Sequence, residues 1–263
     1  MNHFYQGIQG WFDWENIYKA VVELAPMDTP STFVELGAWK GRSSAFLATE
    51  IVNSNKPITL YIVDAWDGRG HTNPDGTPEY NDWQADIQAG LFNTFTINMI
   101  PVKDHYNAIQ SDIAAAAEQF ENESLDFVWL DTSMDYDLVK AELRAWIPKV
   151  RTGGYIGGHD FFSSPNGVGR LVVEEFGNYR TNGQSWYARI QPDGDTSDID
   201  KKLAESGKFF SQAIGPEQSN AYLRGKYAAL SGSTVAPSPQ GDPTTNAVPD
   251  RPEYLRSKYA VKF

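Results

Sequence analysis

Two short apolar runs that end in polar turns constrain the fold of this chain more than any other feature. The first covers residues 33–36 and leads into a turn bounded by Gly37 and Gly41, and the second covers residues 61–63 and ends at Asp64. Buried parallel strands read as continuous apolar runs. Glycines let a ligand approach the backbone closely, and a carboxylate on the neighbouring strand can accept hydrogen bonds from both ribose hydroxyls. Together they predict a nucleoside-binding crevice at the carboxyl ends of parallel strands.

The glycine spacing narrows the choice of nucleoside. A dinucleotide-binding turn needs the pattern G-x-G-x-x-G, but Trp39 and Arg42 occupy its second and third glycine positions. A pyrophosphate would meet side chains there. The pattern present, E-x-G-x-x-x-G, begins at Glu35 and resembles motif I of the class I S-adenosylmethionine-dependent methyltransferases. The alternative is an ordinary strand-to-helix turn with incidental glycines.

Composition sets outer bounds on the function. The chain has 263 residues and 41% hydrophobic residues, enough for a sizeable core, and no cysteine, which excludes disulfides, thiolate metal sites and cysteine nucleophiles. No apolar stretch approaches the ~20 residues of a membrane span, and the N-terminus lacks a signal-peptide pattern. We therefore expect a cytoplasmic protein with no membrane partner. A net charge of −12 repels phosphate backbones, so we also expect no nucleic-acid partner.

Helix and strand patterns alternate along the first two thirds of the chain. The expected strands cover residues 32–36, 58–63, 96–100, 125–130, 154–158 and 185–190. Between them we expect helices capped by Asp13 and Asp112 and helices over 43–52, 81–92, 135–146 and 167–176. A Gly/Pro-rich stretch over 67–79 is long enough to be an active-site loop. Repeated β-α units predict a doubly wound, Rossmann-like, mostly parallel sheet with helices on both faces.

The last seventy residues differ in character. We place the main domain at residues 1–195, with residues 1–30 as a helical N-terminal lid, and a helical appendage at 196–230. Residues 231–263 are expected to be an extended or disordered tail, because 231–250 are rich in Pro, Ser, Thr and Gly. Aromatic residues return at the very end. They could dock on the body or on a partner subunit, which would make the protein a homo-oligomer.

A second segment makes the resemblance more specific. Residues 125–131 form an apolar run ending in Asp131, residues 146–148 read W-I-P, and residues 153–160 read G-G-Y-I-G-G-H-D. With the N-terminal G-W-F at 10–12, this set resembles a family of small-molecule O-methyltransferases with a strand-end G-H-D motif. The likeness covers residues 8–190 and implies a seven-stranded sheet. One departure is Met134, which stands where the family usually has a histidine, so no role of that histidine can be carried over.

The resemblance also implies which residues contact S-adenosylmethionine. Those expected at the cosubstrate are Glu35, Gly37, Ala38, Gly41, Ser43, Asp64 and Asp104. Glu35 could accept hydrogen bonds from the glycine turn or the methionine amine, or it could cap the following helix. Asp104 or His105, after the third expected strand, would lie near the adenine, unless that segment is only a solvated loop. Several tryptophans, among them Trp11, Trp39 and Trp66, could wall the site or simply pack in the core.

Asp131, His159 and Asp160 are the candidate reactive residues. Strands four and five lie side by side in a doubly wound sheet, so the three side chains should meet at their carboxyl ends. Two carboxylates and an imidazole can hold a divalent cation such as Mg²⁺ or Mn²⁺, with Fe²⁺ and Zn²⁺ also compatible, and the cation would acidify an acceptor hydroxyl. Without metal, His159 would be the general base, oriented by Asp131 or Asp160. In a third interpretation the acids only cap helices and His159 only packs.

The sequence therefore predicts a methyltransferase that acts on a hydroxyl of a small polar acceptor. Two alternatives remain: a hydroxylase-like metal-dependent relative on the same fold, and a non-catalytic binding or assembly module descended from it.

Overall fold

The computed structural model describes residues 1–67, 87, 90–163, 167–191 and 193–207. This part of the chain forms a seven-stranded sheet in the order β3-β2-β1-β4-β5-β7-β6. The parallel strands are β1 (Ser31–Leu36), β2 (Ile58–Asp64), β3 (Asn107–Gln110), β4 (Leu125–Leu130) and β5 (Val150–Gly158). Strand order reverses between β1 and β4, which are direct neighbours. The predicted doubly wound α/β fold is confirmed.

The remaining edge of the sheet is antiparallel. β7 (Ser185–Arg189) pairs antiparallel with β5, and β6 (Arg180–Asn182) pairs antiparallel with β7. The sequence predicted β7 as a strand over residues 185–190. The three residues of β6 were missed, because so short a strand carries no readable periodicity.

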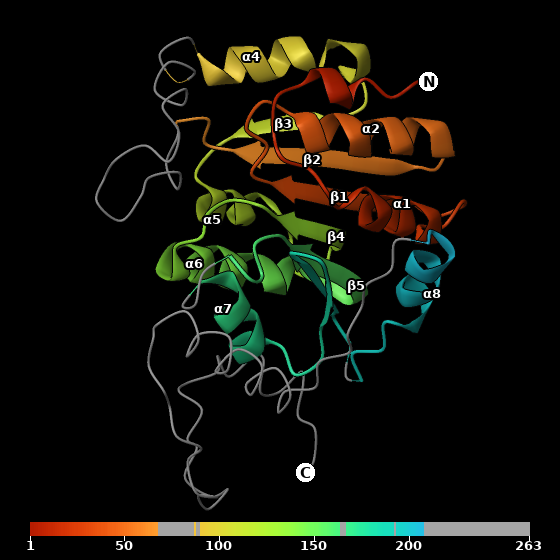
Figure 1. The fold of residues 1–263 in the computed structure, drawn as a ribbon, viewed down its shortest axis with the longest axis vertical. Helices are drawn as coiled ribbons and strands as arrows, with labels where there is room; N and C mark the ends of the chain where they lie inside the picture. Colours follow the sequence, from red (N-terminus) through yellow and green to blue (C-terminus); the bar gives the residue numbers. More distant parts are fainter. Residues whose placement is uncertain (68–86, 88–89, 164–166, 192, 208–263) are drawn as a thin grey trace, which may run out of the picture.

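Alternating side chains of the strands feed two hydrophobic cores, one on each face of the sheet. On β4, Phe127 and Trp129 belong to the core that also contains α1 (Glu15–Leu24) and α2 (Arg42–Ser54). Val128 and Leu130 belong to the other core, shared with α5 (Ile113–Ala116), α6 (Tyr136–Trp146) and α7 (Val168–Glu175). Figure 1 shows the two sets of helices on the two sides of the sheet.

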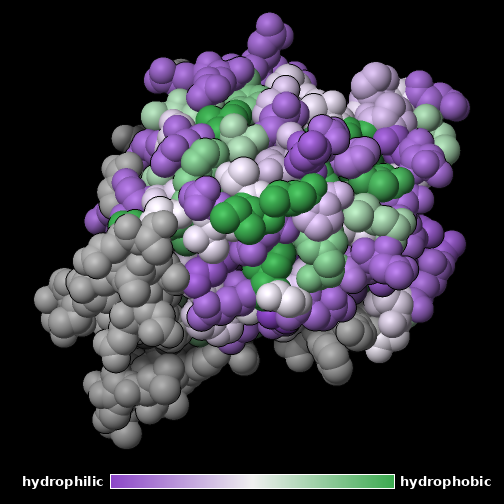
Figure 2. Space-filling view, turned by 90° about the horizontal axis from the view of Figure 1, so that it is seen from above, coloured by the Kyte–Doolittle hydropathy of each residue, from purple (hydrophilic) through white to green (hydrophobic). Residues whose placement is uncertain are grey.

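The strand predicted at residues 96–100 is wrong. Residues 96–98 belong to α4 (Leu91–Asn98), and a 3-10 helix, η2 (Ile100–Val102), follows. Leu91, Phe95 and Met99 are all buried, and their spacing of four residues is that of one helix face. The third strand instead begins at Asn107. Figure 2 shows the side of the molecule near α4, where apolar residues lie among hydrophilic ones.

Both ends of the described chain join the main body. The N-terminal segment contains η1 (Tyr5–Gly7) and runs irregularly to Trp14, after which α1 begins. The predicted cap of α1 by Asp13 is wrong, because Trp14 precedes the helix and no side chain caps it. At the other end α8 (Ser197–Glu205) packs on α1 and buries Ile199 and Leu203 in the same core. The start of the predicted appendage is therefore part of the main body.

Several predictions fall outside the described residues. They concern the 67–79 loop beyond Asp67, most of the 81–92 helix, and everything from residue 208 onward. Among the helices that the structure describes, none has the length and apolar character needed to cross a membrane.

Candidate functional site

A crevice of about 620 Å³ lies where the strand ends meet the N-terminal segment. Its size is that of a small-molecule site. Three groups of residues line it: the glycine turn with Asp64, the ends of β4 and β5, and the N-terminal segment. The full set is Gly10, Trp11, Phe12, Asp13, Trp14, Gly37, Ala38, Trp39, Arg42, Ser43, Asp64, Asp131, Thr132, Ser133, Met134, His159 and Asp160. The predicted crevice at the carboxyl ends of the parallel strands is thus present.

The glycine turn is shaped by the strand ends beneath it. Gly37 has φ +83°, and its amide donates to the carbonyl of Val63 on β2. A Cβ at Gly37 would lie 2.0 Å from the backbone oxygen of Asp131, so no other residue fits there. Gly41, with φ +90°, precedes α2 and packs against Phe95 instead of lining the crevice. Ala38 and Ser43 do line it, as predicted.

Asp64 ties the turn to the end of β2. One carboxylate oxygen accepts from the amides of Ala38 at 2.7 Å and Trp39 at 2.9 Å, and the other accepts from the amide of Trp66 at 2.7 Å. Burial raises the pKa of Asp64, and the three amide hydrogen bonds oppose that rise. Because a carboxylate has about four acceptor positions, Asp64 keeps capacity for a ligand hydroxyl.

Glu35 and Asp104 do not face the crevice. Glu35 is fully buried under the turn, where it accepts hydrogen bonds from the hydroxyls of Tyr18 and Ser44. Burial raises its pKa. Asp104 is exposed in the connection that precedes β3, at the amino end of that strand and away from the crevice. Its predicted place near the adenine depended on the wrong strand at 96–100.

Because the third strand was predicted at residues 96–100, the sequence analysis did not identify the residues at the carboxyl end of β3. Gln110 ends β3 beside Asp64, and its side-chain amide donates to the carbonyl of Ala65 at 3.4 Å. The amide of Ser111 donates to the backbone oxygen of Asp64 at 3.0 Å. These two residues therefore lie beside Asp64 at the carboxyl end of the third strand, the strand end after which the sequence analysis placed Asp104.

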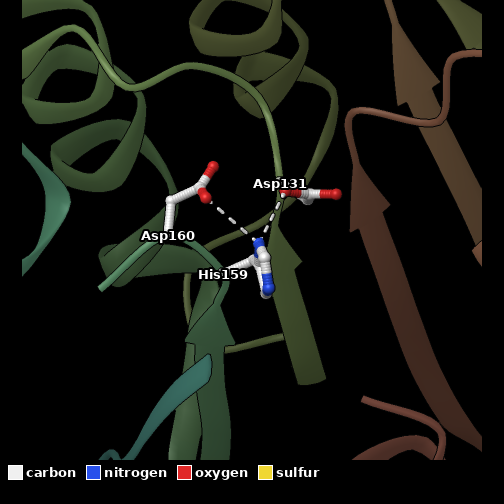
Figure 3. Close-up of side chains that lie close together, drawn as sticks. All are labelled: Asp131, His159 and Asp160. Atoms are coloured by element: carbon white, nitrogen blue, oxygen red, sulfur yellow. Dashed lines mark ion pairs between the residues drawn. The ribbon is translucent and has the colours of Figure 1, made fainter. Parts of the chain in front are cut away.

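Asp131, His159 and Asp160 converge as predicted (Figure 3). Nδ1 of His159 lies 3.2 Å from an oxygen of Asp160 and 3.8 Å from an oxygen of Asp131. Backbone hydrogen bonds fix the frame, because the amide of Asp131 donates to Leu36 and that of His159 donates to Leu130. One donor atom from each side chain lies within 4.8 Å of the others. The three groups could share one small cation.

Asp160 is held in an unusual backbone conformation. Its φ is +61°, a region that residues with a Cβ rarely adopt. The hydroxyl of Ser163 donates to its carboxylate at 2.6 Å, and the amide of Ser163 donates to its backbone oxygen. This turn directs the Asp160 carboxylate back toward His159.

The sequence reasoning missed a third acid beside His159, Asp13. One of its oxygens lies 3.3 Å from Nε2 of His159, on the other side of the ring from Asp160. The ring of the next residue, Trp14, packs on His159 with centroids 4.7 Å apart. Nothing in the local sequence distinguishes Asp13 from a helix cap, so only the fold reveals the contact.

The cluster of acids controls the charge on His159. Burial alone would lower the pKa of His159, but the nearby carboxylates of Asp13, Asp160 and Asp131 outweigh it and raise the pKa to about 10. Burial raises the pKa of Asp131, and His159 opposes that rise. At neutral pH the cluster therefore surrounds a positive charge, the imidazolium, with carboxylates.

Aromatic residues form one side of the crevice mouth. Trp11, 57% exposed, stacks on Trp39 with ring centroids 5.6 Å apart. Trp39 has φ +45°, and its carbonyl accepts from the indole of Trp66 at 2.9 Å. Trp66 is buried behind this wall and does not line the crevice. Met134 does line the crevice.

Comparisons with known proteins agree with this architecture. A family model described as a methyltransferase domain matches residues 34–161, from β1 to the turn after β5. No curated protein sequence matches the chain. The solved structure of the O-methyltransferase NovP is 18% identical, covering 66% of this chain and 78% of that one with a TM-score of 0.51. This likeness shows a shared Rossmann-like α/β fold.

Two further solved structures are more distant. Cofactor-bound Rv0187 from MTB is 12% identical, covering 69% of this chain and 81% of that one, with a TM-score of 0.47. The calicheamicin methyltransferase CalS11 is 14% identical, covering 66% of this chain and 75% of that one, with a TM-score of 0.44.

Proposed function

We propose that this protein is an S-adenosylmethionine-dependent methyltransferase that methylates a hydroxyl of a small polar molecule. The observation that carries the proposal is one crevice in which the Gly37 turn and Asp64 lie beside Asp131, His159 and Asp160. The match of residues 34–161 to a methyltransferase domain supports it. The O-methyltransferase NovP, whose fold this chain shares, supports oxygen as the methylated atom.

The turn and Asp64 are assigned to the cosubstrate. Ala38, Ser43 and Asp64 line the crevice, and the backbone at Gly37 is open on that side because no Cβ is present. Asp64 is assigned to the ribose hydroxyls, with its carboxylate already oriented by three backbone amides. S-adenosylmethionine supplies an electrophilic methyl group: the acceptor hydroxyl gives its proton to a base at the ends of β4 and β5, its oxygen bonds to the methyl carbon, the carbon–sulfur bond breaks, and S-adenosylhomocysteine leaves.

The residues at the ends of β4 and β5 fit a divalent cation. Two carboxylates lie within 3.8 Å of Nδ1 of His159, and like charges held this close need a positive counter-charge, which a cation can supply in place of the ring proton. The oxygen, nitrogen and oxygen donors suit Mg²⁺ or Mn²⁺, with Fe²⁺ and Zn²⁺ also compatible. Asp131, Asp160 and His159 would hold the ion, with the proton of Nδ1 released when the ion binds. A bound cation lowers the pKa of a neighbouring hydroxyl.

The metal-free alternative assigns His159 as the general base. Its raised pKa, about 10, argues against this role, because an imidazole that keeps its proton at neutral pH cannot accept another from the acceptor. Asp131, which also lines the crevice and has a pKa raised by burial, is the better base if no cation binds.

The charge of the crevice bears on the acceptor. Asp13, Asp64, Asp131 and Asp160 all line it, and Arg42 is the one Lys or Arg among its lining residues in the described part of the chain. Such a surface disfavours the phosphate backbone of a nucleic acid. A small acceptor with hydroxyl groups fits both the volume and the charge.

Calorimetry with S-adenosylmethionine and S-adenosylhomocysteine tests the proposal. We expect both to bind with a one-to-one stoichiometry. A hydroxylase-like relative that uses neither, or a non-catalytic module with an empty crevice, would give no heat of binding. Such a result would contradict the proposed function. Where binding is seen, transfer of a labelled methyl group to a panel of hydroxylated small molecules separates a catalyst from a binding module.

A further inference from the structure

We propose that Asp13 is a positioning residue that holds Nε2 of His159, so that Nδ1 is the nitrogen turned toward Asp131 and Asp160. The inference deepens the proposed function and rests on it. It starts from the arrangement of the ring: Asp160 and Asp131 approach Nδ1 at 3.2 and 3.8 Å, and Asp13 approaches Nε2 at 3.3 Å.

Nε2 has no other partner. It is a buried atom with no hydrogen-bond acceptor among the described residues, and the Asp13 carboxylate is the one acid beside it. The ring N–H is not aligned well enough with Asp13 for a hydrogen bond, but the Asp13 side chain is 66% exposed and can turn into line. A buried imidazole N–H without an acceptor destabilises the folded protein. Asp13 therefore favours the form of the ring in which Nε2 carries the proton.

The position of Asp13 is set by its neighbours. Trp14 is 1% exposed and stacks on Trp129 of β4 with centroids 5.6 Å apart, so the chain after Asp13 is firmly anchored. Further back, the guanidinium of Arg42 donates to the carbonyl of Ile8 at 2.8 Å. The segment from Ile8 to Trp14 is thus fastened at both ends, and Asp13 lies over the crevice between these anchors.

This arrangement has a chemical purpose. A histidine that ligates a metal commonly donates its other N–H to a carboxylate, which fixes the ring orientation and the tautomer. Asp13 supplies that carboxylate from the N-terminal segment, whereas Asp131 and Asp160 come from the sheet. The same segment that lines the crevice therefore also orients His159.

Nitrogen-15 NMR of the histidine side chains tests the inference without any activity measurement. We expect the His159 resonances, identified by their absence in His159→Gln, to show a proton on Nε2 that exchanges slowly with water. In Asp13→Ala that proton should exchange faster, and Asp13→Asn should restore part of the protection, because its amide oxygen still accepts. Glu15→Ala is the matched control: it removes an acid two residues away that does not line the crevice. Unchanged exchange in Asp13→Ala would overturn the inference.

Binding of Mn²⁺, followed by electron paramagnetic resonance, gives a second measurement. We expect Asp13→Ala to weaken Mn²⁺ binding by roughly ten- to a hundredfold, the range for removing such a carboxylate. Glu15→Ala should leave it unchanged. Equal Mn²⁺ affinity in Asp13→Ala and the wild type would overturn the role toward a metal. Failure of the wild type to bind S-adenosylhomocysteine would instead count against the proposed function, so the two failures are distinguishable.

Discussion

The backbone oxygen of Asp131 occupies the space that a side chain on Gly37 would need, 2.0 Å from the ideal Cβ position. The cosubstrate turn after β1 and the proposed reactive acid after β4 are therefore in direct contact through their backbones. The amide of Asp131 also donates to Leu36, the residue before Gly37. A change at Gly37 must consequently move both halves of the site.

Gly37→Ala should thus impair more than cosubstrate binding. We expect a loss of stability of about 2–5 kcal/mol, from about 1–2 for the left-handed conformation and about 1–3 for the clash. Gly183→Ala separates the two costs, because Gly183 has φ +62° but nothing within 4 Å of its Cβ position. Thermal unfolding of both variants measures the difference. Equal losses in the two variants would show that the contact with Asp131 carries no cost.

Asp64→Ala should lower the affinity for S-adenosylhomocysteine by about 2–4 kcal/mol, because charged hydrogen bonds to the ribose are lost. It should also lower stability, because the buried amides of Ala38, Trp39 and Trp66 lose their acceptor. Calorimetry and thermal unfolding measure the two effects separately. Asp104→Asn serves as the control, since the structure places that exposed acid at the amino end of β3, and it should change neither quantity. Unaltered binding in a folded Asp64→Ala protein would remove Asp64 from the site.

Much of this site was predictable because its elements are buried and local. The runs that became β1, β2 and β4 are mostly apolar, and the candidate residues Gly37, Asp64 and Asp131 stand at their last residue or directly after it. Once a parallel sheet is assumed, adjacency of β4 and β5 brings Asp131 to His159. No long-range information is required for that step.

The errors have equally local causes. Residues 96–100 are rich in β-formers, but the spacing of Leu91, Phe95 and Met99 follows a helix, and packing of that face decided the outcome. Asp13 has the sequence of a helix cap, yet its partner lies 146 positions further along the chain, since 159 − 13 = 146. Glu35 fits motif I in sequence, but strand alternation places it in the interior. Side-chain direction and distant partners are properties of the assembled fold.

Glu142 should make stability depend on pH. Its carboxylate accepts a hydrogen bond from the hydroxyl of Thr132, a residue that lines the crevice. Burial raises the pKa of Glu142 from 4.5 to about 7. Between these values the folded protein binds more protons than the unfolded chain, so stability falls as pH rises from about 4.5 to 7. Glu142→Gln should therefore be more stable than the wild type at pH 8, but not at pH 4.5. The gain at pH 8 should be at most about 3 kcal/mol, and screening by solvent makes it smaller.

Denaturant unfolding at the two pH values measures this gain. Glu121→Gln, a change of an exposed acid, controls for the general loss of negative charge. A gain of equal size at pH 4.5 and pH 8 would contradict the assignment of the effect to ionisation of Glu142.

The proposed cation site requires the carboxylates of Asp131 and Asp160 at the ends of β4 and β5. Asp131→Asn and Asp160→Asn each remove one negative charge from a cluster whose donor atoms lie within 4.8 Å, so each should weaken Mn²⁺ binding by at least about tenfold. Neither should change the affinity for S-adenosylhomocysteine by much, because Asp64 and the glycine turn are intact. Asp28→Asn, at an exposed acid in the turn before β1, controls for the loss of charge.

Methyl transfer in excess chelator supplies the decisive measurement. We expect activity to fall and to return with Mg²⁺ or Mn²⁺. Full turnover without metal would end the cation assignment and leave Asp131 as the base.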